Sequence, residues 1–296
     1  MADLQLIETT HPNPSARAEF DHLVGINANK EALVEQLALV LAPGRAEAWR
    51  KKHHPQGLPL LDRLGRTAPL VLLSGEVGCG KTALARSVGT PLSELLDQKV
   101  TLYETPSDVR GSGMVGDLSR RITASFEQAR RRTQRGVGLL LIDEADDLAT
   151  ERAQEQAHHE DRAGVNALIK EIDGLARGQG ARLAVILITN RAEVIDPAVH
   201  RRASLHLTFG RPEAAARRAV FAALLGSAVS PSDLARLVQA SEQPVPYSFS
   251  DLVERLGRRV LMAGLRRDVP AGVELVLEML GEVEPTPLLK GAHDGA

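Results

Sequence analysis

The segment Gly75-Glu76-Val77-Gly78-Cys79-Gly80-Lys81-Thr82 constrains this chain more than any other part of the sequence. It matches the pattern G-x4-G-K-[ST], in which a glycine-rich loop joins a buried strand to a helix. An apolar run over 68–74 predicts that strand, and a helical pattern begins at Thr82. The loop amides and the positive end of the following helix both favour a bound phosphate. The pattern therefore predicts an ATP site in which Lys81 reaches the β- and γ-phosphates and Thr82 ligates Mg²⁺.

A second segment, Leu139-Leu140-Leu141-Ile142-Asp143-Glu144, supplies the acids that such a site needs. An Asp-Glu pair after an apolar strand is weak evidence alone, but it becomes strong downstream of a phosphate loop. Asp143 can hold the Mg²⁺ shell, and Glu144 can orient or deprotonate the attacking water. Together the two segments predict ATP hydrolysis.

Short apolar strands alternate with helices through the first two thirds of the chain. Strands without polar alternation, separated by helices, indicate a parallel sheet that helices cover on both faces. The expected strands lie over 68–74, 100–103, 138–142 and 183–189, and the expected helices over 82–88, 122–132 and 162–175.

Beyond Gly210 the strand signals end, and Pro212 stands where a first helical turn would begin. Ser230-Pro231 and Ser248-Phe249-Ser250-Asp251 mark two further helix starts, the second with capping-box spacing. The sequence predicts an α/β fold followed by a small all-helical domain. The expected division is an N-terminal tail over 1–20, a large α/β domain over 21–211, a helical domain over 212–284 and a C-terminal tail over 285–296.

Composition excludes several other classes. Apolar residues make up 43% and charged residues 25% of the 296 residues, which is ordinary globular composition. The net charge of −2 and 3% aromatic content argue against nucleic-acid or membrane binding. The single cysteine, Cys79, excludes an internal disulfide and is typical of a reducing compartment. No signal peptide or bilayer-length apolar run is visible, so we expect a cytoplasmic protein.

Two further positions point beyond a simple nucleotide binder. Asn190 follows the strand over 183–189, where a neutral amide can position the attacking water opposite Glu144. Arg201-Arg202 follows soon after, and an arginine there can stabilise γ-phosphate charge on a neighbouring subunit. A solvated arginine pair is the alternative for these residues.

These residues resemble the AAA+ ATPases over roughly residues 20–265. Gly75–Thr82 is similar to the family's Walker A motif, Leu139–Glu144 to Walker B, and Asn190 to sensor 1. Arg202 resembles the arginine finger, with Arg201 as a possible second. The resemblance also implies that Val24 and Gly25, within Leu23-Val24-Gly25-Ile26, border the adenine, that the helical domain is the family's lid, and that the active form is a homo-hexameric ring.

The resemblance assigns two loops as well. Met114-Val115-Gly116 lies where family members that thread polypeptides place a pore loop, and methionine is adaptable enough to grip varied side chains. A surface loop with one exposed methionine is the alternative. His158-His159-Glu160-Asp161 invites a metal site, but no second ligand cluster accompanies it, so a surface or second pore-loop role is preferred.

The segment over 161–225 contains Val199-His200-Arg201-Arg202-Ala203-Ser204 and Gly210-Arg211-Pro212-Glu213-Ala214-Ala215. In these residues it is similar to the pachytene-checkpoint branch of the family, whose members remodel HORMA-domain proteins. Compact bacterial members of that branch accompany HORMA proteins and a nucleotidyltransferase in anti-phage systems, and the chain resembles those. The lid lacks the family's Gly-Arg sensor 2, for which Arg255 is a weak substitute.

The leading hypothesis is a hexameric AAA+ motor that uses ATP and Mg²⁺ to unfold a HORMA-domain partner by threading it past Met114. One alternative is a nucleic-acid motor or loader, for which Arg130-Arg131-Arg132 and Arg135 offer a basic strip. Another is a slow, nucleotide-dependent regulatory switch.

Overall fold

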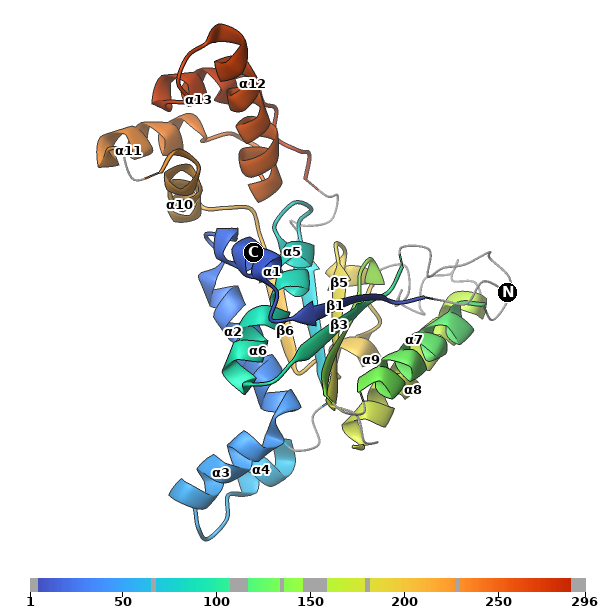
Figure 1. Ribbon diagram of the computed structural model, residues 1–296. Coiled ribbons are helices and arrows are strands. Elements are labelled where there is room, and N and C mark those ends of the chain that lie inside the picture. Colours follow the sequence, from blue (N-terminus) through green and yellow to red (C-terminus); the bar gives the residue numbers. More distant parts are fainter. Residues whose placement is uncertain are drawn as a thin grey trace. The chain divides into compact units, whose positions relative to one another are not determined.

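The computed structural model describes residues 5–64, 68–106, 117–133, 136–145, 159–178, 182–226 and 229–288 (Figure 1). Their contacts divide the chain into two compact units. The first contains the residues up to Phe20 together with Ala28–Ser74 and Thr82–Thr208. The second contains Asp21–Asn27, the loop Gly75–Lys81 and the residues from Phe209 onward.

A six-stranded sheet of order β1-β3-β4-β5-β2-β6 organises the first unit. Strands β3, β4, β5 and β2 pair in parallel, which confirms the expected α/β fold. The apolar runs are buried on both faces, so they show no polar alternation; Leu70 to Leu73, for example, are all 0% exposed. The bounds are β1 (Ile7–His11), β2 (Leu70–Gly75), β3 (Val100–Glu104), β4 (Val137–Ile142), β5 (Arg182–Thr189) and β6 (Leu205–Phe209).

Helices α7 (Asp117–Thr133) and α8 (His159–Ala176) pack together on one face of this sheet. Phe126 of α7 and Ile172 of α8 are completely buried in the same cluster as Leu70 and Leu140. Other helices of this part are α2 (Asn27–Leu41), α3 (Pro43–His53), α4 (Pro59–Leu64), α5 (Lys81–Ser87), α6 (Gly89–Leu96) and the short α9 (Pro197–His200).

The N-terminal segment corrects the expectation of a tail over 1–20. Ile7–His11 forms β1, which pairs antiparallel with β3, and α1 (Pro14–His22) follows it. The strand carries Glu and Thr because it lies at the sheet edge, where only some of its side chains are buried. His11 is 0% exposed and lies 2.8 Å from the Thr90 hydroxyl, which attaches the segment to α6.

The C-terminal part of the second unit is helical, as expected. A compact apolar core, which includes Phe221, Tyr247 and Leu252, holds its helices together. Ser248 and Asp251 form the expected capping box, with each backbone N–H donating to the other side chain at 2.9 and 3.1 Å. The elements are α10 (Ala214–Leu225), α11 (Pro231–Ala240), the π-helical segment η3 (Asp251–Leu256), α12 (Gly257–Arg267) and α13 (Val273–Leu280).

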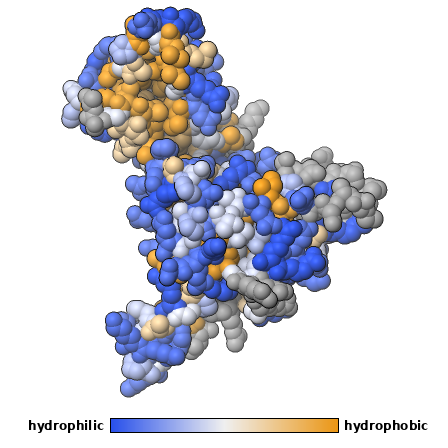
Figure 2. Space-filling model, viewed as in Figure 1, coloured by the Kyte–Doolittle hydropathy of each residue, from blue (hydrophilic) through white to orange (hydrophobic). Residues whose placement is uncertain are grey.

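Hydrophobic side chains gather on the surface of these C-terminal helices (Figure 2). On α12, Leu261, Met262 and Leu265 are 59%, 61% and 75% exposed. A group of exposed large apolar side chains is typical of an interaction surface. None of the helices in the described ranges is long and apolar enough to span a membrane.

Candidate active site

The phosphate loop begins where β2 ends, at Gly75. Its φ is +127°, and a Cβ atom there would lie 2.0 Å from the carbonyl oxygen of Phe209. Any side chain would both strain the backbone and collide with β6. The next residue, Glu76, donates its N–H to the same Phe209 oxygen at 3.0 Å. The first glycine of the motif is therefore needed for the loop to leave the sheet.

The middle of the loop packs on the start of η3 within the second unit. Gly78 has a φ of +72°, and a Cβ atom there would lie 2.9 Å from the Ser248 hydroxyl. Its carbonyl oxygen accepts a hydrogen bond from the Ser250 N–H at 2.9 Å. The loop conformation is thus fixed by contacts as well as by its glycines.

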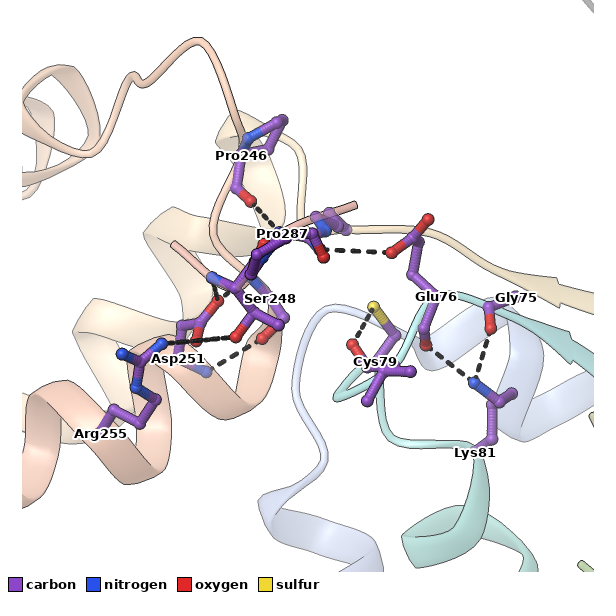
Figure 3. Close-up of polar contacts among 12 residues, drawn as sticks. Gly75, Glu76, Cys79, Lys81, Pro246, Ser248, Asp251, Arg255 and Pro287 are labelled. Atoms are coloured by element: carbon purple, nitrogen blue, oxygen red, sulfur yellow. Dashed lines mark hydrogen bonds and ion pairs between the residues drawn. The ribbon is translucent and has the colours of Figure 1, made fainter. Parts of the chain in front are cut away.

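Lys81 folds back over the loop that precedes it. Its Nζ atom donates to the carbonyl oxygens of Gly75 and Glu76 at 2.8 Å each, and the residue is 5% exposed (Figure 3). The ammonium group therefore lies at the start of the loop, where it can donate to phosphate oxygens. The arrangement fits the role predicted for Lys81.

Cys79 lies inside the loop, 1% exposed, with its Sγ atom 3.8 Å from the Val77 carbonyl oxygen. Burial raises the pKa of its thiol to about 11, because the charged thiolate loses its hydration there. The thiol is therefore neutral near pH 7, which agrees with a packing role and not with a nucleophile.

The segment Leu23-Val24-Gly25-Ile26 forms an apolar wall beside this loop in the second unit. Val24 packs on the core of the C-terminal helices, and the Cβ position of Gly80 lies 3.6 and 3.7 Å from carbons of Leu23 and Ile26. At Gly25 a Cβ atom would lie 2.8 Å from Ala216 Cβ. The segment therefore lies between the phosphate loop and the C-terminal helices of the second unit.

The oxygen ligands predicted for Mg²⁺ meet in the first unit. Thr82 donates its hydroxyl to Asp143 Oδ2 at 2.8 Å, and the Glu144 N–H donates to Asp143 Oδ1 at 2.8 Å. Mg²⁺ prefers one or two such oxygens together with waters and substrate phosphates. The pair fits Mg²⁺ on these grounds, and the part of the chain described here holds no cluster of three or more His, Cys, Asp or Glu for another metal.

Glu144 has a left-handed backbone, with a φ of +54°, directly after Asp143. This conformation is costly for a residue with a side chain and concentrates at functional sites. The Glu144 side chain is exposed and lies just beyond the carboxyl end of β4. It is available to a bound water.

Asn190 is partly buried and lies one residue beyond the carboxyl end of β5. Strands β4 and β5 are parallel neighbours in which Ile142 pairs with Leu187. Asn190 therefore lies at the same end of the sheet as Asp143 and Glu144. Residues that act on one water are expected to lie close together in this way.

The two arginines of the predicted finger differ in their surroundings. Arg202 donates from Nε and Nη2 to the two Asp173 oxygens at 2.6 and 2.9 Å, and from Nη1 to the Ala198 carbonyl at 2.9 Å. Arg201 is exposed, and no other residue in the described ranges pairs with it. Arg201 is thus free to reach another molecule, whereas Arg202 is held by its own chain.

Two arginines of the basic strip considered for nucleic acid form ion pairs within the first unit. Arg130 pairs with Glu171 at 2.6 Å, and Arg132 pairs with Glu8. Arg255, the substitute considered for sensor 2, donates to Asp251 at 2.7 Å and to the Glu284 carbonyl at 2.9 Å. Met114-Val115-Gly116, His158 and Arg135 lie outside the described residues.

One buried pair escaped prediction from sequence. Arg211 and Glu76 form an ion pair at 3.2 Å, with side chains only 5% and 12% exposed. No spacing rule connects positions so far apart in the chain, and the available signal was only an acid in the phosphate loop and an arginine before Pro212.

The comparisons with known proteins agree with this geometry. Residues 71–211 match the family model described as ATPase family associated with various cellular activities (AAA). CD-NTase-associated protein 6 of Escherichia coli (strain MS 115-1) is 36% identical over 290 residues, 93% of each chain. A chain of the E. coli MS115-1 HORMA:CdnC:Trip13 complex has a TM-score of 0.89 at 35% identity and covers 97% of this chain and 98% of its own. The structure of Rhizobiales Trip13 has a TM-score of 0.75 at 34% identity, with coverages of 95% and 98%.

Proposed function

This chain belongs to the AAA family of ATPases and hydrolyses ATP, and from that premise we propose that it is a homo-hexameric motor that remodels a HORMA-domain protein. The observation that carries the proposal is the match, over nearly the whole of both chains, with a chain of the HORMA:CdnC:Trip13 complex. A relative named for its association with a CD-NTase supports a role beside such an enzyme in anti-phage signalling.

In the proposed site, each residue has a role that its surroundings support. Lys81 exchanges its carbonyl partners for the β- and γ-phosphates, while Val24 and Gly25 border the adenine. Mg²⁺, held through Thr82 and Asp143, neutralises phosphate charge when it is bound.

The attacking water is oriented by two groups at one sheet edge. Glu144 accepts its proton or aligns it, and the Asn190 amide fixes its position from the neighbouring strand. Substitution Glu144→Gln then gives a protein that binds ATP but turns it over very slowly, and this protein serves as a trap for the assembled state.

The ring is supported by two observations on the isolated chain. Arg201 is exposed, as a residue that acts on a neighbouring copy must be, and α12 carries a group of exposed apolar side chains. We expect Glu144→Gln with ATP and Mg²⁺ to elute at the mass of six chains. A mass of one chain under these conditions would contradict the ring.

The threading step is assigned to Met114, Val115 and Gly116 as the pore loop. The test uses a purified HORMA-domain protein from the same source, whose addition is expected to raise ATP turnover several-fold. Met114→Ala should lose remodelling while ATP binding persists, and Leu60→Ala, which alters an exposed apolar side chain on α4, is the matched control. Remodelling that survives Met114→Ala would exclude threading past this loop, and absent stimulation in the parent protein would exclude the partner.

The nucleic-acid alternative finds little support. Two arginines of its basic strip are paired within the chain, which lowers the charge available to phosphates. Turnover unaffected by added DNA, alongside stimulation by the HORMA-domain protein, is the expected result.

A further inference from the structure

Arg211 connects the phosphate loop to two distant parts of the second unit. It lies just after β6, and its side chain is 5% exposed. Its Nη1 atom donates to the carbonyl oxygens of Pro246 and Thr286 at 2.5 and 2.6 Å. Its Nη2 atom donates to the Pro287 carbonyl at 3.0 Å and to Glu76 Oε2 at 3.2 Å. One guanidinium therefore joins the loop, the turn that precedes η3 and the segment Glu284–Pro287.

Glu76 is the point where this connection meets the ATP-binding machinery. Its carbonyl oxygen accepts from Lys81 at 2.8 Å (Figure 3). Its backbone N–H donates to the Phe209 carbonyl oxygen, and its carboxylate pairs with Arg211. Glu76 therefore contacts Lys81 through its backbone carbonyl oxygen and Arg211 through its side-chain carboxylate.

Hydrogen bonds hold the segment Glu284–Pro287 in place, and so they fix the positions of the carbonyl oxygens that accept from Arg211. Asp251, 0% exposed, accepts from the Thr286 N–H at 3.0 Å and from the Thr286 hydroxyl at 2.6 Å. Arg255 donates to the Glu284 carbonyl at 2.9 Å. Asp251, a residue of the capping box of η3, therefore fixes the position of Thr286, and the Thr286 carbonyl oxygen in turn accepts from Arg211.

The charge of Glu76 gives this network a consequence for ATP binding. A carboxylate in a phosphate loop repels a triphosphate unless a cation compensates its charge. Removal of only the cation from a buried ion pair leaves an uncompensated buried charge, which is more destabilising than the absence of both partners. We propose that Arg211 is a positioning residue for the phosphate loop, which neutralises and orients Glu76 and is itself held by the segment Glu284–Pro287. The role rests on the proposed use of this loop to bind ATP and does not depend on the HORMA-domain partner.

The main test compares the dissociation constant for a fluorescent ATP analogue and the kcat of ATP hydrolysis in the full-length protein. Arg211→Met should raise the dissociation constant about tenfold, while kcat at saturating ATP stays within about twofold. Glu76→Gln/Arg211→Met should recover most of the lost affinity, because it also removes the uncompensated carboxylate. Thr286→Ala, which loses the hydroxyl bonds with Asp251 and Arg255 but keeps the backbone groups of Thr286, should have a smaller effect in the same direction.

The matched control is Arg217→Met. Arg217 is another arginine of the second unit with a side chain only 6% exposed, but its partners are Glu242 and the Pro212 carbonyl, and it does not contact the loop. It should lower the melting temperature as much as Arg211→Met does, with an unchanged dissociation constant.

The outcomes separate the possibilities. Equal dissociation constants for Arg211→Met and Arg217→Met would overturn the proposal, as would a double variant that binds ATP no better than Arg211→Met. If Arg211→Met does not fold, Thr286→Ala still tests it, since unchanged ATP affinity in that variant would overturn the role. A parent protein that fails to bind ATP would instead overturn the proposed ATP site.

Discussion

Arg202 holds Asp173 through two hydrogen bonds of 2.6 and 2.9 Å, and these bonds keep the pKa of the Asp173 carboxylate below its ordinary value. The pair joins the turn after α9 to α8 and leaves the preceding residue, Arg201, exposed. The sequence resemblance gives Arg202 as the arginine finger, with Arg201 as a possible second, and leaves open which of the two is the main one. The ion pair favours a division of roles in which Arg202 fixes the turn and Arg201 reaches the neighbouring site.

Arg201→Ala should therefore lower kcat at least about 100-fold, because a finger that acts on the transition state contributes mainly to turnover. Arg202→Ala should lower kcat less and cost at most about 1 kcal/mol of stability, since its ion pair is partly exposed. Mixing Arg201→Ala with Lys81→Ala subunits should restore part of the activity, because each then supplies what the other lacks. Steady-state turnover of the two variants and their mixture measures this, and a mixture with no recovery would place the finger elsewhere.

Glu144 illustrates a conflict between stability and catalysis. Its φ of +54° is unfavourable for any residue except glycine. Glu144→Gly and Glu144→Ala should both abolish measurable turnover, but the glycine variant should be about 1 kcal/mol more stable than the alanine variant. Urea unfolding of the two variants measures the difference. Equal stability would mean that the backbone changes conformation once the side chain is removed.

The thiol of Cys79 is expected to resist alkylation in the native protein. With a pKa of about 11, only about 0.1% of the thiol is thiolate at pH 8, and burial restricts access further. Iodoacetamide labelling followed by mass spectrometry should proceed at least about 100-fold more slowly in native protein than in urea. Cys79→Ala should retain activity within about threefold, and rapid native labelling would show that the loop opens often.

The sequence predicted the parts of this site that depend on local rules. Gly75, Lys81 and Asp143 belong to segments in which strand, loop and helix signals are contiguous, and the parallel sheet follows from apolar strands that alternate with helices. The register of β4 and β5 then brings Asn190 to the edge that carries Glu144.

The features that escaped prediction depend on contacts between distant segments. Strand β1 is polar because it is an edge strand, so the apolar pattern that revealed the other strands is missing from Ile7–His11. The pairing of Arg211 with Glu76, and that of Asp251 with Thr286, are set by how the helices pack. Such pairs follow from the folded structure and not from sequence spacing.

Asp251 should make the stability of the second unit sensitive to acid. Burial alone would raise the pKa of this carboxylate, but hydrogen bonds from Thr286, the Ser248 N–H and Arg255 hold it well below its ordinary value. A folded pKa below the unfolded value, about 3.9, means that the contribution to stability is present above about pH 4 and is lost as the pH falls toward the folded pKa.

Asp251→Asn should therefore cost about 1–3 kcal/mol at pH 7, because it disrupts a buried charged network, and the cost should shrink steadily below pH 4. Urea unfolding followed between pH 7 and pH 3 measures this, with Glu254→Gln, an exposed carboxylate on the same helical segment, as the control. A penalty that stays constant down to pH 3 would mean that Asp251 acts through its shape and not through its charge. In that case the hydrogen bonds between Asp251 and Thr286, and the position of the Thr286 carbonyl that Arg211 contacts, would be independent of pH.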